Sequence, residues 1–302
     1  MIQYNKGYKR NYIITMIEIT KDILKEIYKE RSSNVKKYDF GLVVIIGGSD
    51  FYSGPPAFSA LAAYRSGADV VRVIAPERAA DIIASFSPSL ATYSLEGKWL
   101  EKKHLSILAA QMQSAKIVAN GNAAMVIGGG LGRSKPTQEA ISEFLSQCDC
   151  RAVIDADAIY AVGKKPEVIS GKNFIITPHA YEFFILTGKE VSHLAEEKKI
   201  EMVRQEAERL QTTILLKGST DIISNGKEVA LGHTGNPYMT KGGTGDTLAG
   251  ICGALLARNI DPFSSAQAAA YINGKAGELA SEKLKEGLLA MDLIEAIPSV
   301  LH

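Results

Sequence analysis

The densest cluster of residues able to do chemistry is the run Gly235-Asn-Pro-Tyr-Met-Thr-Lys-Gly-Gly-Thr-Gly-Asp-Thr-Leu-Ala-Gly250. Glycines let successive N–H groups converge on a phosphate, and the start of a following helix adds partial positive charge at the same point. Asp246 falls in the first turn of that helix, where the helix field is expected to keep its carboxylate ionised. Because an ionised carboxylate repels phosphate, its expected task is to address a hydroxyl under attack, or an ion that bridges the carboxylate to the phosphate. The pattern predicts a phosphoryl-transfer site, and an N-capped helix after a flexible turn is the alternative.

Five shorter polar clusters each follow an apolar run with the character of a strand. They are residues 47–54, 128–132, 155–157, 177–182 and 217–221. In open α/β sheets, ligands bind at the carboxyl ends of the strands. These clusters are therefore candidates for the same site as the glycine-rich run.

Several side chains in these clusters have a structural interpretation besides ligand contact. His179 could form hydrogen bonds at the start of a helix, and Asp155 and Asp157 could cap the next helix. Glu182 lies in a first helical turn, where the helix field alone favours a carboxylate. Lys217 could be an exposed lysine at a strand end, or it could reach a phosphate as a point charge. The residues alone leave both interpretations open.

Apolar runs alternate with helical segments along most of the chain. A strand, a glycine turn, a helix and a second strand in succession, as over residues 42–75, are typical of a parallel sheet covered on both faces. Asn120-Gly121 allows a tight hairpin between strands at 116–119 and 125–127, so the expected sheet need not be purely parallel. The remaining expected strands are 152–155, 174–176, 213–216 and 221–224, and the expected helices are 17–30, 53–65, 136–147, 194–210, 243–258 and 264–284.

Composition limits the classes of partner. The chain has 302 residues, 46% of them hydrophobic, and 34 Lys and Arg against 33 Asp and Glu, so no global charge favours nucleic acid or an anionic membrane. No apolar run approaches the roughly 18–20 residues that span a bilayer, so a cytoplasmic protein is expected. Cys148, Cys150 and Cys252 are too few and too unevenly placed for a disulfide framework or a zinc site. They are interpreted as structural or incidental thiols.

The pattern predicts one main domain. Residues 1–35 are expected to form an N-terminal extension with its helix, and residues 36–302 a single domain without repeats or linkers. Residues 1–15 carry no periodic pattern, so Met16 is a possible start.

The glycine-rich run gains specificity from its surroundings. Gly242-Gly-Thr-Gly-Asp246, followed by Leu248-Ala-Gly250 and preceded by Gly235-Asn-Pro, resembles the anion-hole signature of ribokinase-like enzymes. The ordered set Gly48-Ser-Asp-Phe-Tyr-Ser-Gly54, Gly128 to Gly132, Asp155-Ala-Asp157-Ala, Thr177-Pro-His179, Glu182 and Lys217-Gly218 is similar to the ADP/ATP-dependent NAD(P)H-hydrate dehydratases. The similarity extends over about residues 40–297. It implies a ribokinase-like three-layer α/β fold, with a mostly parallel central sheet flanked by helices.

The resemblance also implies a reaction. In this family the S form of hydrated NADH or NADPH (NADHX or NADPHX) is dehydrated to NAD(P)H, through phosphorylation of the ring hydroxyl and elimination of phosphate. The implied donor is ADP or ATP, with ADP favoured by the free-standing members, and Mg²⁺ is expected although no metal-ligand cluster is visible. The family further implies a homotetramer and a separate epimerase protein, because the segment before residue 40 is too short to hold an epimerase domain.

The family's site residues carry over position by position. The adenine-nucleotide contacts fall on Lys217, Gly218, Ser219, Thr220, Asp221, Gly243, Thr244 and Gly245, with Asp246 as the catalytic residue. The contacts to the hydrated dinucleotide fall on Pro55, Gly130, His179 and Asp246, with Asp157, Glu182 and Asn236 in support. Two positions depart from the family's pattern, since Pro55-Pro56 removes a backbone donor and Gly129 replaces a usual proline.

Two other functions fit the same residues. A small-molecule kinase of the vitamin-precursor type would use Asp246 on the hydroxymethyl or hydroxyethyl group of a heterocycle. A nucleotide-binding sensor would keep the fold without the chemistry, and the presence of Asp246 argues against it.

Overall fold

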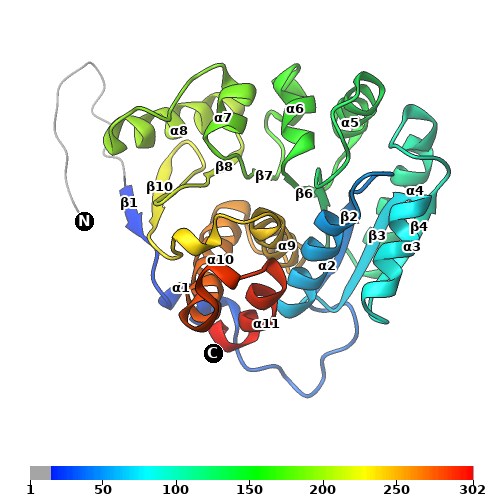
Figure 1. Cartoon of the computed structure of the whole chain (residues 1–302), viewed down its shortest axis with the longest axis horizontal. Coiled ribbons are helices and arrows are strands. Elements are labelled where there is room, and N and C mark those ends of the chain that lie inside the picture. The colour runs from blue at the N-terminus through cyan, green and yellow to red at the C-terminus, as the bar shows by residue number, and fades with distance from the viewer. Residues whose placement is uncertain (1–14, 302) are drawn as a thin grey trace.

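The computed structural model describes residues 15–301 and shows one sheet between two layers of helices (Figure 1). The strands are β1 (Thr15–Glu18), β2 (Leu42–Ile46), β3 (Val70–Pro76), β4 (Ala91–Leu95), β5 (Ala123–Ile127), β6 (Arg151–Ile154), β7 (Phe174–Ile176), β8 (Thr213–Leu216), β9 (Asp221–Ser224) and β10 (Glu228–Gly232). The helices are α1 (Asp22–Ile27), α2 (Gly54–Arg65), α3 (Glu77–Phe86), α4 (Leu105–Val118), α5 (Lys135–Gln147), α6 (Asp157–Gly163), α7 (Ala180–Thr187), α8 (Glu196–Leu210), α9 (Thr244–Ala257), α10 (Pro262–Leu284) and α11 (Ala290–Val300). Short 3₁₀ turns are η1 (Lys102–His104), η2 (Pro166–Ile169), η3 (Pro237–Met239) and η4 (Lys285–Gly287).

The sheet has ten strands in the order β1-β10-β9-β8-β7-β6-β5-β2-β3-β4. The seven strands from β8 to β4 run parallel, while β9 is antiparallel to both of its neighbours. From β2 the chain builds outward through β3 and β4, and then returns to β5 on the other side. The carboxyl ends of β2 and β5 therefore form the switch point where α/β sheets bind ligands.

Two hydrophobic cores lie on opposite faces of the sheet. Every residue of β2 is buried, because alternate side chains enter opposite layers: Val43 and Ile45 join one core, and Leu42, Val44 and Ile46 the other. The first core is completed by α2, α3, α9, α10 and α11, and the second by α4 to α8 (Figure 1). This arrangement confirms the three-layer, mostly parallel α/β fold. No helix within residues 15–301 is long and apolar enough to cross a membrane.

Helices α2 and α9 pack with almost no space between their backbones. A side chain on Gly250 would place its Cβ 2.1 Å from the carbonyl oxygen of Ser59, so only glycine fits there. The Ser59 hydroxyl donates a hydrogen bond of 2.9 Å to the backbone carbonyl of Asp246. The packing of these two helices therefore fixes the first turn of α9 relative to the sheet.

Two predicted elements near the edges are wrong. The helix expected over 17–30 is limited to α1, and Ile17 instead belongs to β1, which pairs in parallel with β10. The strand expected at 116–119 is the last turn of α4, so Asn120-Gly121 ends a helix and forms no hairpin. At 116–119 the apolar run was too short to separate a strand from a helical turn. At residue 17 the pairing with β10, a contact distant in sequence, decides for a strand.

The interpretation of all three cysteines as thiols is also corrected. Cys148 and Cys150 form a disulfide at the corner between α5 and β6, while Cys252 is a buried thiol in α9. A pairing across one intervening residue adds nothing to a disulfide framework, so the number and spacing of the cysteines do not predict it.

Candidate active site

The turns after β2 and β5 meet at the switch point. The N–H of Gly48 donates a hydrogen bond of 2.8 Å to the carbonyl of Gly129. Gly128 has φ +141°, and a Cβ there would lie 1.7 Å from the carbonyl oxygen of Asp155, so the turn after β5 requires glycine at this position. The expected close approach of backbone at residues 128–132 is thus present.

Asp246 lies against this turn. Helix α9 begins after Gly243, whose φ of +99° turns the chain into the helix, and Asp246 is in the first turn. A Cβ on Gly129 would lie 2.8 Å from Asp246 Oδ1 and 2.9 Å from Cβ of Pro55, the second residue of α2. Three segments far apart in the sequence therefore converge on the carboxylate, as their assignment to one site predicts.

The expectation that the helix field keeps Asp246 ionised needs correction. Burial raises the pKa of its carboxyl to about 7, the neighbouring Asp155 carboxylate acts in the same direction, and Lys217 opposes them. Loss of hydration therefore outweighs the favourable position at the start of α9. A carboxyl with a pKa near neutrality is well suited to accept a proton from a substrate hydroxyl and to release it again.

Lys217 is the centre of a charged cluster beside Asp246. Its Nζ lies 3.0 Å from Asp155 Oδ1 and 3.7 Å from Glu182 Oε2, and both carboxylate side chains are almost completely buried. Asp155 Oδ1 also accepts a 2.8 Å hydrogen bond from the Thr177 hydroxyl. Burial alone would lower the pKa of Lys217, but the carboxylates of Asp155 and Glu182 prevail and raise it. Lys217 is therefore a fixed cation aimed into the site, and the exposed strand-end interpretation is wrong.

The segment after β8 forms a tight turn next to the start of α9. The N–H of Gly218 donates a 3.0 Å hydrogen bond to Asp221 Oδ1, and the Thr220 hydroxyl donates a 3.1 Å bond to Glu196 Oε2. Burial raises the pKa of Asp221 to about 6. A Cβ on Gly245 would lie 3.4 Å from Lys217 Nζ, so the two predicted nucleotide segments face each other.

A cavity of about 280 Å³ opens beside this turn. Its walls include residues 216–220 from the end of β8 and Val191, Glu196 and Lys199 from α8 and the segment before it. It is lined on one side by the same backbone that the sequence assigns to an adenine nucleotide. Thr244 serves the turn itself, because its hydroxyl donates to the carbonyls of Met239 and Lys241 at 2.9 and 3.0 Å.

His179 has the structural role that the sequence left open, and it also remains accessible. It caps α7, since Nδ1 accepts hydrogen bonds from the backbone N–H groups of Tyr181 and Glu182 at 3.1 and 3.3 Å. Glu182 returns the contact by accepting a 2.9 Å bond from the N–H of His179, which completes a capping box. The His179 side chain is still 52% exposed, although its Nε2 lies 3.5 Å from Glu182 Oε1, so the ring presents part of its surface to a ligand.

Gly130 and Pro55 are packed with an exposed aromatic residue. A Cβ on Gly130 would lie 2.9 Å from Tyr52 Cβ and 3.3 Å from Pro55 Cγ, and Gly130 has φ +71°. Tyr52 is 51% exposed and its ring contacts that of Phe51 edge to face, with centroids 4.6 Å apart. The two aromatic rings extend the site along the loop that precedes α2.

Two of the supporting residues lie outside the charged cluster. Asp157 binds the N–H of Gly132 and Nε of Arg133, each at 2.8 Å, while Asn236 caps η3 and donates to Ser281 at the side of α10. Neither Asp155 nor Asp157 caps α6, because Ala156 occupies that position with φ +48°.

Asp155 is a further residue of the site, beyond those that the family resemblance assigns. Its carboxylate accepts a hydrogen bond from Lys217, a partner that the sequence does not predict. Its position directly after a buried strand indicates a site residue, but its partner can be identified only from the folded structure.

The carboxylates of the site do not form a metal centre by themselves. Within residues 15–301, no three His, Cys, Asp or Glu side chains are arranged to hold a metal ion. A divalent cation bound mainly by phosphates needs only one or two carboxylates from the protein. Asp155 and Asp246 are close enough to interact electrostatically and could supply them.

The mostly parallel sheet, the glycine turn at the start of α9 and the buried aspartate beside it define a ribokinase-like α/β protein. A solved structure described as a ribokinase-like superfamily protein from Enterococcus faecalis V583 is 26% identical, with a TM-score of 0.79, over 97% of this chain and 98% of that one.

The sequence matches the NAD(P)H-hydrate dehydratase family over residues 43–299, and the chain belongs to that family. It is 40% identical to the ADP-dependent (S)-NAD(P)H-hydrate dehydratase of Cenarchaeum symbiosum over 94% of this chain and 96% of that protein. The solved ADP/ATP-dependent NAD(P)H-hydrate dehydratase from Bacillus subtilis, co-crystallized with ATP and Mg²⁺, is 27% identical, with a TM-score of 0.75, over 94% and 97% of the two chains. The chain spans about half the length of the bifunctional NAD(P)H-hydrate repair enzymes that it also matches.

Proposed function

We propose that this protein is a nucleotide-dependent (S)-NAD(P)H-hydrate dehydratase, a hydro-lyase of metabolite repair. The observation that carries the proposal is the meeting of Asp246, Gly129 and Pro55 at the switch point, with Lys217 and Gly245 beside them. Family membership and the printed activity of the Cenarchaeum relative support the choice of substrate.

The proposed reaction begins with transfer of a phosphoryl group. The Asp246 carboxylate takes the proton of the ring hydroxyl while that oxygen forms a bond to the terminal phosphorus of the nucleotide, and the bond from phosphorus to the leaving nucleotide breaks. The N–H groups of Gly243, Thr244 and Gly245 and the Lys217 ammonium are placed to stabilise negative charge on the transferring group.

Elimination of phosphate completes the reaction. Hydroxide is a poor leaving group, whereas phosphate leaves readily when the ring nitrogen supplies electrons. The carbon–oxygen bond breaks, a ring proton is lost, and the double bond of NAD(P)H is restored. With ADP as donor the balance is NAD(P)HX plus ADP giving NAD(P)H, AMP and inorganic phosphate.

ADP is the proposed donor, because the free-standing relative that covers most of this chain is named ADP-dependent. Mg²⁺ is proposed to accompany the nucleotide, as in the co-crystals of the Bacillus enzyme. It would be held mainly by the phosphates and would neutralise part of their charge. The segment from Lys217 to Asp221 is assigned to the nucleotide, and His179, Gly130 and Pro55 to the hydrated dinucleotide.

The proposal extends to the setting of the enzyme. We expect a cytoplasmic protein, and a separate epimerase that converts the R form of the hydrate to the S form. A homotetramer is supported by exposed apolar side chains in the last third of the chain, among them Leu279, Leu284, Leu289 and Met291. Light scattering coupled to size-exclusion chromatography tests this, and a mass other than that of four chains would refute it.

The experiment that tests the function uses the Asp246→Ala variant. Turnover of chemically hydrated NADH should be abolished while nucleotide binding, followed by calorimetry, is retained. Unchanged turnover would exclude the assigned role of Asp246. Transfer of phosphate to a hydroxyalkyl heterocycle, without any reaction of the hydrate, would establish the vitamin-type kinase instead.

A further inference from the structure

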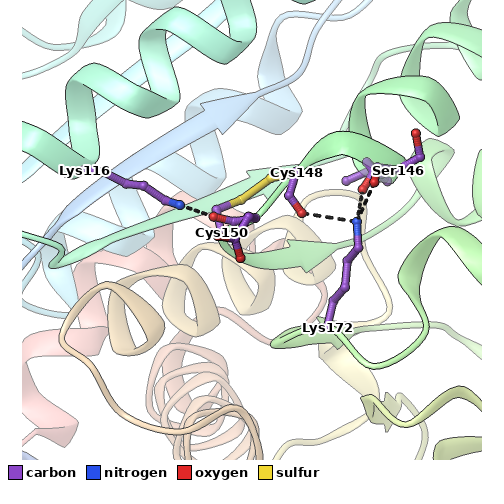
Figure 2. The surroundings of a disulfide bond; sticks show 7 residues. Lys116, Ser146, Cys148, Cys150 and Lys172 are labelled. Carbon is purple, nitrogen blue, oxygen red and sulfur yellow. Dashed lines mark hydrogen bonds between the residues drawn. A yellow bond between two sulfur atoms is a disulfide. The ribbon is translucent and has the colours of Figure 1, made fainter.

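Cys148 and Cys150 form a disulfide (Figure 2). It lies at the other end of β6 from Asp155, away from the proposed active site. It stands between the end of α5 at Gln147 and the start of β6 at Arg151. The two Cα atoms are 5.7 Å apart, within the usual range for disulfides. The backbone of this corner therefore accommodates the bond.

Both cysteines are accessible to small molecules. They are half-buried, and they line a cavity of about 610 Å³ that opens to solvent. The cavity is large enough to admit a small thiol compound. The third cysteine, Cys252, is completely buried, and burial raises the pKa of its thiol.

The cavity is rich in positive charge. Lys116, Arg151 and Lys172 line it, with Asp149 as the carboxylate among the lining side chains. Lys172 Nζ donates to the carbonyls of Ser146 and Cys148 at 3.1 and 3.2 Å, and Lys116 Nζ donates to the carbonyl of Asp149 (Figure 2). Within the described part of the chain, none of the three cations lies within salt-bridge distance of a carboxylate.

The ammonium of Lys172 would gain from an anion in this cavity. Burial lowers its pKa, and the Asp149 carboxylate acts in the opposite direction. A thiolate formed beside it would supply further negative charge, and nearby cations are known to favour the thiolate form of cysteine. The geometry thus combines an accessible disulfide with a stabilising charge for the thiolate that its cleavage produces.

We propose that Cys148 and Cys150 form a reversible thiol–disulfide exchange site for anionic low-molecular-mass thiols and disulfides. In the reducing direction, a thiolate attacks one sulfur, the protein disulfide breaks, and a mixed disulfide and one cysteine thiolate form. A second thiolate attacks the sulfur of the bound thiol, which releases the small disulfide and the other cysteine thiolate. Two small thiols are oxidised, the protein gains two electrons, and the two protons pass to the cysteines.

Reduction should leave the fold intact. A bond across one intervening residue removes little conformational freedom from the unfolded chain, so little stability depends on it. The backbone of this corner remains held by hydrogen bonds from Lys172 and Lys116 to the carbonyls of Ser146, Cys148 and Asp149. The exchange is therefore a property of the native protein.

The first test equilibrates the folded protein with mixtures of reduced and oxidised glutathione, then labels free thiols with a maleimide and measures the intact mass. Two labels should appear together, in one two-electron transition, with Cys252 unlabelled throughout. Cys148→Ser and Cys150→Ser should each abolish the two-electron transition and leave one thiol, which is labelled in reducing mixtures and carries a glutathione mixed disulfide in oxidising ones. Absence of the disulfide even in the most oxidising mixture, or its reduction only in denaturant, would overturn the proposal.

The second test addresses the charge. Lys172→Gln should slow reduction by glutathione, an anionic thiol, by roughly three- to fivefold, the effect of one unit charge a few ångströms away in water. Lys172→Arg keeps the charge and should restore the rate. Reduction by cysteamine, a cationic thiol, should slow less than reduction by glutathione in Lys172→Gln, because only the stabilisation of the released cysteine thiolate is lost. Equal slowing with both thiols would refute selection for anionic reagents.

Discussion

Replacing Asp246 by asparagine should stabilise the protein at alkaline pH even though it removes the proposed catalytic group. The carboxyl is largely buried at the start of α9, where burial, assisted by Asp155, raises its pKa to about 7. Asparagine has nearly the same shape and no charge. It therefore avoids the cost of holding an ionised carboxylate at this position.

The sign and size of this stability difference follow from the pKa of the Asp246 carboxyl in the unfolded chain and in the folded protein. A carboxyl whose pKa is higher in the folded protein than in the unfolded chain binds its proton more tightly when folded, so the wild type loses stability as pH rises from the unfolded value to the folded one. The difference between about 3.9 in the unfolded chain and about 7 in the fold corresponds to at most about 4 kcal/mol. For a chain of this length that amounts to about 6 °C in Tm.

The assay is the Tm of wild type and Asp246→Asn at pH 4.5 and at pH 8.5. The advantage of the variant should be small at the lower pH and grow to several degrees at the higher one, with a plateau above pH 7. Asp81→Asn, which removes an exposed carboxylate from α3, controls for the loss of one negative charge. A difference between wild type and Asp246→Asn that is the same at both pH values, or larger at pH 4.5, would refute the reasoning.

Two further predictions concern turnover. The kcat/KM of the wild type should fall tenfold per pH unit below about pH 7, where Asp246 becomes protonated. Because Lys217 lowers the pKa of Asp246, Lys217→Met should move this decline to higher pH. A pH profile that does not move would contradict the coupling of the two residues. Gly129→Ala places a Cβ 2.8 Å from Asp246 Oδ1, so the carboxylate must shift by about half an ångström and kcat should drop about tenfold. Gly54→Ala, whose Cβ would meet only the Phe58 ring at 3.5 Å, should keep kcat within twofold, and equal losses in both variants would exclude the steric explanation.

The central part of the sheet could be predicted from the sequence. Strands such as β2 and β7 are uninterrupted apolar runs, because both faces of a central strand are covered, and each is followed by a polar turn that carries site residues. The outer strands gave no such signal. In β4 most side chains are exposed, and β1 lies at the edge of the sheet formed by residues 15–301, beside β10, so neither has the composition of a buried strand.

The site could be predicted in composition but not in its pairings. Spacing and type pointed to Asp246 and Lys217, since each follows a strand or opens a helix in a glycine-rich context. The contact of Lys217 with Asp155 joins residues 62 positions apart in the chain, and the raised pKa of Asp246 depends on burial that only the packed fold provides. Local sequence patterns predict neither the partner of Lys217 nor the burial of Asp246.

The most direct test of the proposed function is the absorbance of the reduced-nicotinamide band when purified protein is mixed with chemically hydrated NADH, Mg²⁺ and either ADP or ATP. The proposal predicts a rise that requires a nucleotide, proceeds with ADP, and is absent in Asp246→Ala. No rise with either nucleotide, from protein that still binds ADP, would contradict the assignment as a dehydratase.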